Sequence, residues 1–156
     1  MISLNPLQLE RFEDELTLHQ CITKVFEGDA DLLQHYHFMR GSELSVCVKN
    51  TFETILEANN SFVLDWHKVV NEGEVVGYLV TSQSIMGVKV LYSFGLMKEV
   101  RKKLAKDLFS SIQQILGNDF ISILWSHNTR AIDYLVKNGM KVVSRTQQTV
   151  TLILCP

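Results

Sequence analysis

The chain has 156 residues, of which 46% are hydrophobic and 21% are charged, and its formal net charge at pH 7 is -2. This composition excludes a disordered chain, and no apolar stretch approaches the roughly 20 residues that a bilayer-spanning helix needs. The small negative charge gives no general reason to expect nucleic acid or an anionic membrane as a partner. We expect residues 1–156 to form a single domain with a core large enough to fold without disulfides or metals.

The cysteines indicate a reducing compartment. Cys21, Cys47 and Cys155 are widely spaced, odd in number and in no CxxC pair, which is typical of free thiols in the cytoplasm. The N-terminus shows no basic segment followed by an apolar run, so no signal peptide is expected. His35 and His37 have the spacing of two metal ligands, but no cysteine or carboxylate completes a set. No metal site is therefore expected.

The N-terminal 60 residues are predicted to be helical. Asn5 suits an N-cap, Pro6 the first helical position and Gln8 the capping-box position, so the sequence predicts a helix from Asn5 to Gly28. Residues 16–23 also alternate well enough for a strand, but the helix is the preferred interpretation. Shorter segments are predicted as a strand over 2–4 and as helices over 31–39 and 42–58.

The hydrophobic period changes after about residue 60. Segments rich in β-branched and aromatic residues follow, with a hairpin turn at Glu72-Gly73. Asn128 suits the N-cap of a later helix, and Gly139 its end. The nearly continuous apolar run over 120–125 predicts a strand buried on both faces. The predicted order is strands over 62–70, 75–80 and 88–97, a helix over 98–116, a strand over 120–125, a helix over 128–137, and strands over 140–144 and 149–154.

This order predicts an α/β fold with a mixed sheet. The strand–helix–strand unit from Val88 to Trp125 requires its two strands to be parallel. The strands before and after it form hairpins, so an antiparallel meander leads into one parallel pair. Helices are expected on both faces of the sheet.

The order and the segment Asn128-Thr-Arg-Ala-Ile-Asp-Tyr-Leu-Val-Lys-Asn-Gly-Met140 resemble the GCN5-related N-acetyltransferase (GNAT) superfamily. The matching features are the capping Asn128, the inward Ala131-Ile132 pair, Lys137, and Gly139 before an apolar strand. The element order covers most of the chain, whereas the sequence resemblance is confined to its second half. The resemblance implies an acyl-CoA-binding part over 61–156, a splayed parallel strand pair, and acetyl-CoA as co-substrate for transfer to an amine.

The resemblance also implies where CoA binds. Its pantetheine would follow the main chain at Phe94–Met97, and its pyrophosphate would lie on the N-terminus of the next helix. The family's loop there is Arg/Gln-x-x-Gly-x-Gly/Ala, but this chain has Arg101-Lys-Lys-Leu-Ala-Lys106. Basic side chains in the first turns oppose the helix macrodipole by about 0.3–1 kcal/mol each, so we expect them to bind an anion such as the 3′-phospho-ADP end of CoA. A solvated basic face is the alternative. The predicted co-substrate contacts are Phe94, Gly95, Leu96, Met97, Arg101, Lys102, Lys103, Leu104, Ala105, Lys106 and Asn128.

The catalytic candidates are His127 and Tyr134. Many family members place a tyrosine general acid in the last motif, but residue-by-residue matching puts Leu135 at that position and Tyr134 one residue early. The strand over 88–97 has no carboxylate to serve as general base, and the imidazole of His127 is the best replacement. The alternative for both candidates is a structural role.

The resemblance implies that the acceptor side includes Asp65 and Trp66 in the first strand of the meander, while for Trp66 core packing is the preferred interpretation. The acceptor itself, a small molecule or a peptide with an amine, is not specified by the sequence. The basic cluster after residue 97 has no aromatics interleaved with the charges, so nucleic acid is not the expected partner. The C-terminal hairpin offers an edge at which a homodimer could form.

Two functions from different classes stay open at this point. The first is an acetyl-CoA-dependent N-acetyltransferase. The second is a non-catalytic structural or assembly protein. The basic residues in place of the loop glycines, together with Asn-Thr-x-x-Ile-x-aromatic-Leu-x-x-x-Gly after the buried strand, loosely resemble small GNAT-like proteins of short-tailed phages, some of which are internal virion components. The loop glycines, the tyrosine acid and the strand carboxylate are all missing from their expected places, but the rest of the fold pattern is kept, which favours the enzyme.

Overall fold

The computed structural model describes residues 5–27, 44–61, 64–83, 87–126 and 128–155. In chain order the elements are β1 (Leu7–Arg11), α1 (Glu15–Phe26), α4 (Leu44–Ser61), β2 (Leu64–Asn71), β3 (Glu74–Gln83), β4 (Lys89–Leu96), α5 (Lys98–Leu116), β5 (Phe120–Trp125), α6 (Thr129–Lys137), β6 (Lys141–Arg145) and β7 (Thr149–Leu154). No helix among these residues is long and apolar enough to cross a membrane. The predicted strand over 2–4, the predicted helix over 31–39 and the pair His35/His37 lie outside the described residues.

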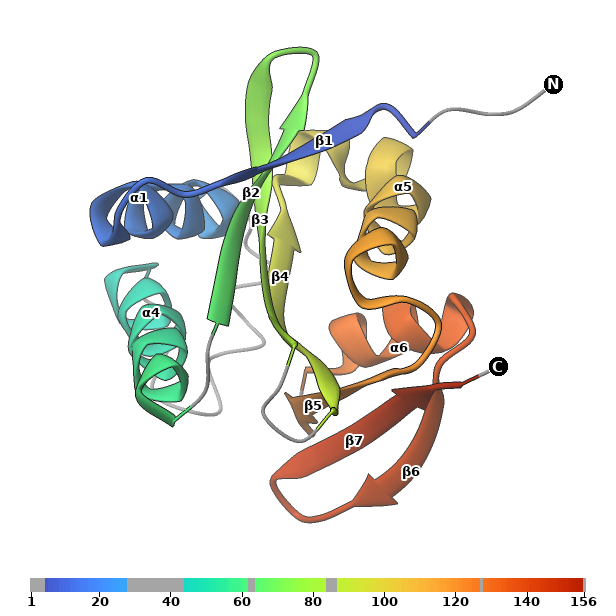
Figure 1. The fold of residues 1–156 in the computed structure, drawn as a ribbon. Helices are drawn as coiled ribbons and strands as arrows, with labels where there is room; N and C mark the ends of the chain where they lie inside the picture. Colours follow the sequence, from blue (N-terminus) through green and yellow to red (C-terminus); the bar gives the residue numbers. More distant parts are fainter. Residues whose placement is uncertain (1–4, 28–43, 62–63, 84–86, 127, 156) are drawn as a thin grey trace, which may run out of the picture.

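The strands form one mixed sheet of seven, in the order β1-β2-β3-β4-β5-β7-β6. All neighbours are antiparallel except β4 and β5, which are parallel. Helices α1 and α4 lie on one face of the sheet, and α5 and α6 lie on the other (Figure 1). The predicted α/β class and mixed sheet are therefore confirmed.

The prediction that a helix begins at Asn5 is wrong. Residues 7–11 instead form β1, which pairs with β2 at the sheet edge. The Asn5 side chain makes tertiary bonds, donating to Asp107 O at 3.1 Å and to Ser111 Oγ at 2.8 Å. The real N-cap is Asp14, whose Oδ1 accepts from the N–H of Thr17 at 2.8 Å. From there α1 follows the predicted helix, and the strand alternative over 16–23 is wrong.

The predicted hairpin at Glu72-Gly73 is confirmed. Both residues have positive φ, 52° and 79°, and they join β2 to β3 with Asn71 paired to Glu74. Two consecutive residues of positive φ are the pattern of a type I′ turn, whose twist matches that of the flanking strands. This turn sets the pairing at the start of β3, and a β-bulge at Val76 then shifts it, since Val70 lies opposite Val75 but Val69 opposite Gly77.

The core has one cluster on each face of the sheet. The larger cluster lies between the sheet and helices α5 and α6, and it includes Leu91, Leu104 and Leu135. The smaller cluster lies between the sheet and α1 and α4 and includes Phe26 and Tyr78. The predicted helices over 42–58, 98–116 and 128–137 are confirmed as α4, α5 and α6. Each face thus holds its helix pair by its own apolar contacts.

Candidate active site

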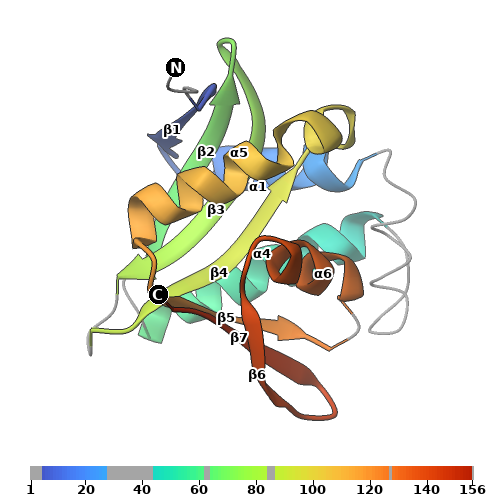
Figure 2. The same cartoon turned by 90° about the vertical axis from the view of Figure 1, so that its right-hand side faces the viewer.

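Strands β4 and β5 are paired only near their beginnings. Val90 lies opposite Ile121 and Leu91 opposite Ser122, and the parallel ladder ends there. The Ser122 hydroxyl donates to the carbonyl oxygen of Leu91 at 3.0 Å, which fixes the last paired position. Beyond it the two strands diverge (Figure 2).

A β-bulge in β4 accounts for the divergence. Val80 of β3 lies opposite Ser93, but its neighbour Thr81 lies opposite Leu91, so Tyr92 is an extra residue in β4. A bulge bends its strand and increases the local twist. Because it comes directly after Leu91, β4 turns away from β5 at the point where their pairing stops. The splayed parallel pair that the resemblance implied is present.

The divergence opens a cleft of about 870 Å³. Residues 92–96 of β4 and 123–125 of β5 all line it. Side chains alternate between the faces of a strand, so consecutive lining residues mean that the strands present their edges to the cleft. An unpaired strand edge offers backbone N–H and C=O groups to a ligand with amides. Phe94, Gly95 and Leu96, three of the predicted co-substrate contacts, lie on this edge.

Strand β5 is not buried on both faces as predicted. Ile123 and Trp125 are 52% and 38% exposed, whereas Phe120, Ser122 and Leu124 are buried. The two exposed side chains line the cleft. The apolar run in the sequence therefore contributes to the wall of the cleft as well as to the core.

The wall formed by α5 and α6 is cationic. Arg101, Lys102 and Lys106 of α5 line the cleft, together with Arg130 and Lys137 of α6. Among the cleft residues that the structure describes, the one carboxylate is that of Asp133. Such a wall attracts an anionic group. The α6 cations were missed in the sequence, although residues 130 and 137 stand two helical turns apart and so share a face.

The cleft runs along the side of α5, from Arg101 to Leu108. Helix α5 begins at Lys98 and continues to Leu116, so residues 101–106 are helical and their N–H groups are used within the helix. Side chains, not a glycine loop, therefore face the cleft here. Arg101 is also anchored to the end of β4, since its Nη2 donates to Leu96 O at 3.3 Å.

Three of the predicted co-substrate contacts do not line the cleft. Leu104 is 1% exposed and packs in the core, and Lys103 is exposed on another side of α5. Met97 is the N-cap of α5, and its N–H donates to Val76 O at 2.8 Å. Ala105 and Asn128 do line the cleft. Asn128 caps α6 as predicted, its Oδ1 accepting from the N–H of Ala131 at 3.4 Å.

Tyr134 lies on the cleft wall, with its hydroxyl committed to α5. The phenol donates to Ala105 O at 2.6 Å, and the ring centroid is 5.6 Å from that of Phe94. Burial raises the pKa of this phenol, so it stays protonated at neutral pH. His127, the other catalytic candidate, lies outside the described residues.

Asp65 and Trp66, the predicted acceptor contacts, are not on the cleft. Asp65 forms an ion pair with Arg11 of β1 at 3.0 Å, and Trp66 packs against the core cluster beneath α1 and α4. The residues that do line the cleft on this side were not predicted. They are Val25, Phe26, Asn50, Thr51, Thr54, Ile55 and Tyr78. In the sequence, those on α1 and α4 show only as the apolar and small polar face of a helix, which any core helix also shows, and Tyr78 shows only as a residue of β3.

Comparison with solved structures identifies the fold. The PaiA N-acetyltransferase of Thermoplasma acidophilum, solved in complex with coenzyme A, has a TM-score of 0.70 and 14% identity over 96% of this chain and 99% of that chain. A probable GNAT-family acetyltransferase of Chromobacterium violaceum has a TM-score of 0.63 and 12% identity over 96% of this chain and 87% of that chain.

The N-acetyltransferase PseH of Campylobacter jejuni, solved with acetyl coenzyme A, has a TM-score of 0.52 and 10% identity over 95% of this chain and 97% of that chain. No family model and no curated protein matches the sequence. The likeness is therefore one of architecture, and it extends over nearly the whole chain. The chain has the fold of the GCN5-related N-acetyltransferases.

Proposed function

We propose that the protein is an acetyl-CoA-dependent N-acetyltransferase. The observation that carries the proposal is the cleft between β4 and β5, which joins an open strand edge to a cationic helical wall. Its volume of about 870 Å³ lies within the roughly 300–1,000 Å³ typical of small-molecule sites. A purely structural or assembly role accounts for neither the open strand edge nor the cations beside it.

The cleft suits the two chemically different parts of CoA. The pantetheine arm carries amides, which match the N–H and C=O groups along Phe94–Leu96. The phosphates match Lys102 and Lys106 of α5 and Lys137 of α6, which reach one cleft from two helices. Lysine binds phosphate as a point charge and needs no fixed backbone geometry. Side chains thus replace the missing loop glycines in this proposal.

The reaction is a direct transfer. The lone pair of the acceptor nitrogen attacks the thioester carbonyl carbon, a C–N bond forms, the C–S bond breaks, and the proton lost by nitrogen balances the one gained by the CoA thiolate. Backbone N–H groups near the Tyr92 bulge are suited to stabilise the developing oxyanion, and the cleft holds the two substrates in line. His127 is the proposed general base, on the sequence argument alone. Tyr134 is proposed to position α6 against α5 and not to donate to the thiolate.

The experiment is a transfer assay with acetyl-CoA and a panel of primary amines. The released CoA thiol is followed with a thiol reagent, and the acetylated amine is measured by mass spectrometry. The proposal predicts thiol and acetylated product in equal amounts, both dependent on the amine. Thiol release that does not respond to any amine would mean simple hydrolysis and contradict it. A homodimer through β6, which lies at the sheet edge, remains a separate proposal that sedimentation would test.

A further inference from the structure

The charged residues of the cleft are confined to one side. Among the described residues that line it, every charged side chain comes from α5 or α6, whereas those from α1, α4 and β3 are neutral. Val25, Phe26 and Ile55 on this neutral side are each 2% exposed, so the cleft ends against closed apolar packing. The cleft therefore has a cationic end, at α5 and α6, and a neutral end, at α1, α4 and β3.

Thr51 is the unusual residue of the neutral end. It lines the cleft and is 8% exposed, and its Oγ1 is buried with no hydrogen-bond partner among the described residues. Buried hydroxyls are nearly always paired, so one that is not requires an explanation. A ligand atom supplied at the cleft is such an explanation.

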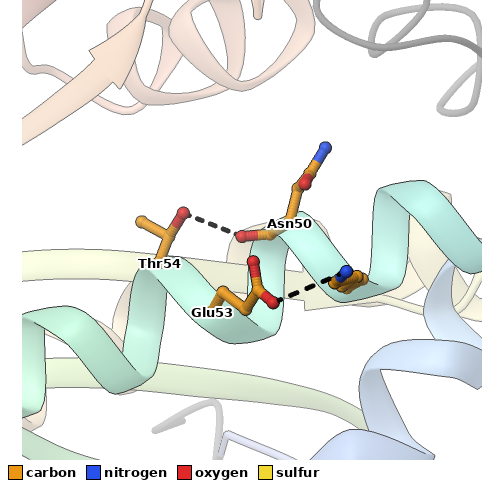
Figure 3. A network of polar contacts seen from close by, with 4 residues as sticks. Asn50, Glu53 and Thr54 are labelled. Carbon is orange, nitrogen blue, oxygen red and sulfur yellow. Dashed lines mark hydrogen bonds and ion pairs between the residues drawn. The ribbon is translucent and has the colours of Figure 1, made fainter.

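The neighbouring threonine on the same helix shows the contrast. The Thr54 hydroxyl donates to the carbonyl oxygen of Asn50 at 2.8 Å, and Lys49 is paired with Glu53 at 4.0 Å. Figure 3 shows both contacts, with the Asn50 side chain extending away from the helix. Asn50 is half-buried and also lines the cleft. The neutral end thus offers a hydroxyl and an amide as polar groups within a mainly apolar wall.

We infer that the neutral end binds the acyl acceptor, that the Thr51 hydroxyl hydrogen-bonds it, and that the acceptor is a primary amine on an apolar or aromatic frame. This inference rests on the proposed acetyl transfer. An acetyl group has only two carbons and does not fill the neutral end of the cleft. The space beyond the reacting carbonyl is therefore available to the acceptor. A polycationic or anionic acceptor would lose its hydration here without gaining an opposite charge from the described wall. An acceptor with an apolar frame and one polar atom loses little hydration on entering the cleft, and it gains a hydrogen bond to the Thr51 hydroxyl.

The apolar group could instead be a long acyl chain carried by CoA. Both sources present the same chemistry to Val25, Phe26 and Ile55. Octanoyl-CoA separates them, because it fills the neutral end itself and would then exclude the acceptor. We assign the neutral end to the acceptor. With an aromatic amine as acceptor, acetyl-CoA must therefore be a better acyl donor than octanoyl-CoA.

The test uses 2-phenylethylamine as acceptor at saturating acetyl-CoA, with spermidine as the polycationic comparison. Thr51→Val keeps the shape and removes the hydroxyl, and Thr51→Ser keeps the hydroxyl. The matched control is Thr23→Val in α1, whose hydroxyl bonds the carbonyl oxygen of His19 at 2.9 Å and does not line the cleft. Calorimetric titration with acetyl-CoA accompanies each variant.

Thr51→Val is expected to raise the KM for 2-phenylethylamine roughly tenfold, the size of one lost hydrogen bond, with kcat and acetyl-CoA affinity unchanged. Its melting temperature should stay the same or rise, because no intramolecular bond is lost. Thr51→Ser and Thr23→Val should keep the wild-type KM.

Each of these results would overturn the inference: an unchanged KM in Thr51→Val, a lower melting temperature in that variant, preference for spermidine, or preference for octanoyl-CoA. If acetyl-CoA binds and 2-phenylethylamine is not acetylated, the acceptor class is wrong while the proposed function stands. If acetyl-CoA itself does not bind, the proposed function fails first.

Discussion

The phenolic hydroxyl of Tyr134 donates to the carbonyl oxygen of Ala105 at 2.6 Å and so joins α6 to α5 on the wall of the cleft. Together with the apolar packing of the two helices, this contact fixes where the α6 cations lie relative to those of α5. The ring of the same residue packs near Phe94 on the edge of β4. One side chain therefore connects the three elements that form the proposed CoA site.

Tyr134→Phe is predicted to affect structure more than chemistry. The loss of one buried hydrogen bond should lower the free energy of unfolding by about 1 kcal/mol, and the affinity for acetyl-CoA should fall a few-fold. The value of kcat should stay within roughly threefold, whereas loss of a general acid reduces it by about 10²–10⁴-fold. Urea denaturation and steady-state kinetics measure these effects. A hundredfold loss of kcat with unchanged CoA binding would make Tyr134 the acid after all.

Trp125 should report ligand binding by its fluorescence. It lines the cleft and is 38% exposed, whereas Trp66 lies against the core beneath α1 and α4. A ligand in the cleft displaces water from the Trp125 ring, so emission should shift to shorter wavelength when acetyl-CoA is added. Trp125→Phe should abolish the shift and Trp66→Phe should keep it. The opposite pattern would mean that the ligand binds elsewhere.

Gly77 and Gly95 are predicted to differ in their tolerance of a methyl group. A Cβ at Gly77 would overlap the carbonyl oxygen of Gly95, whereas a Cβ at Gly95 would meet the side chains of Val25 at 2.9 Å and Tyr78 at 3.0 Å. Backbone in the middle of a sheet cannot move aside as a side chain can. Gly77→Ala should cost about 3 kcal/mol and Gly95→Ala about 1 kcal/mol, within the usual range for overpacking. Chemical denaturation gives the free energy of unfolding of both variants. A larger loss in Gly95→Ala than in Gly77→Ala would contradict the close approach of β3 and β4 at Gly77.

His67 should make folding stability depend on pH. Burial, the largest cause, lowers the pKa of this imidazole, and nearby Arg11 adds to the shift while Asp65 opposes it. The unfolded chain takes up a proton near the ordinary histidine pKa of about 6.5, and the folded chain does so only at lower pH. The free energy of unfolding therefore falls as pH drops from above 6.5 through the folded pKa, and levels off below it.

The matched variant for this prediction is His67→Gln, which cannot titrate. Thermal unfolding at pH 7.5 and pH 5.5 should show a larger drop in melting temperature for the wild type than for the variant. Comparing the two proteins removes the contribution of the other histidines. Equal drops would mean that His67 is protonated as easily in the folded state as in the unfolded chain.

The second half of the fold could be predicted because its signals are local. Asn128 and Gly139 delimit α6, Glu72-Gly73 forms the hairpin, and the apolar spacing of α5 identifies its buried face. In each case the types of a few neighbouring residues are enough to predict the local backbone conformation. The parallel pair then follows from connection rules.

The parts that were missed depend on tertiary context. Asn5 carries helix-start chemistry, but its side chain bonds α5 and the segment after it pairs with β2. The apolar run of β5 gives no sign that Ile123 and Trp125 face a cleft. Thr51 and its neighbours reach the site because α4 packs against α1 on that face of the sheet, and no short-range sequence pattern encodes that packing.

Calorimetric titration with acetyl-CoA tests whether CoA binds in the cleft between β4 and β5. The proteins compared are the wild type, a Lys102→Ala/Lys106→Ala variant and a Lys103→Ala variant. All three lysines are on α5, but Lys103 does not line the cleft. We predict that the wild type binds, that the double variant binds roughly tenfold or more weakly with a smaller dependence on salt, and that Lys103→Ala binds as the wild type does. If the wild type does not bind at millimolar acetyl-CoA, the protein is not an acetyl-CoA-dependent enzyme. If Lys103→Ala weakens binding as much as the double variant, CoA does not lie in the cleft.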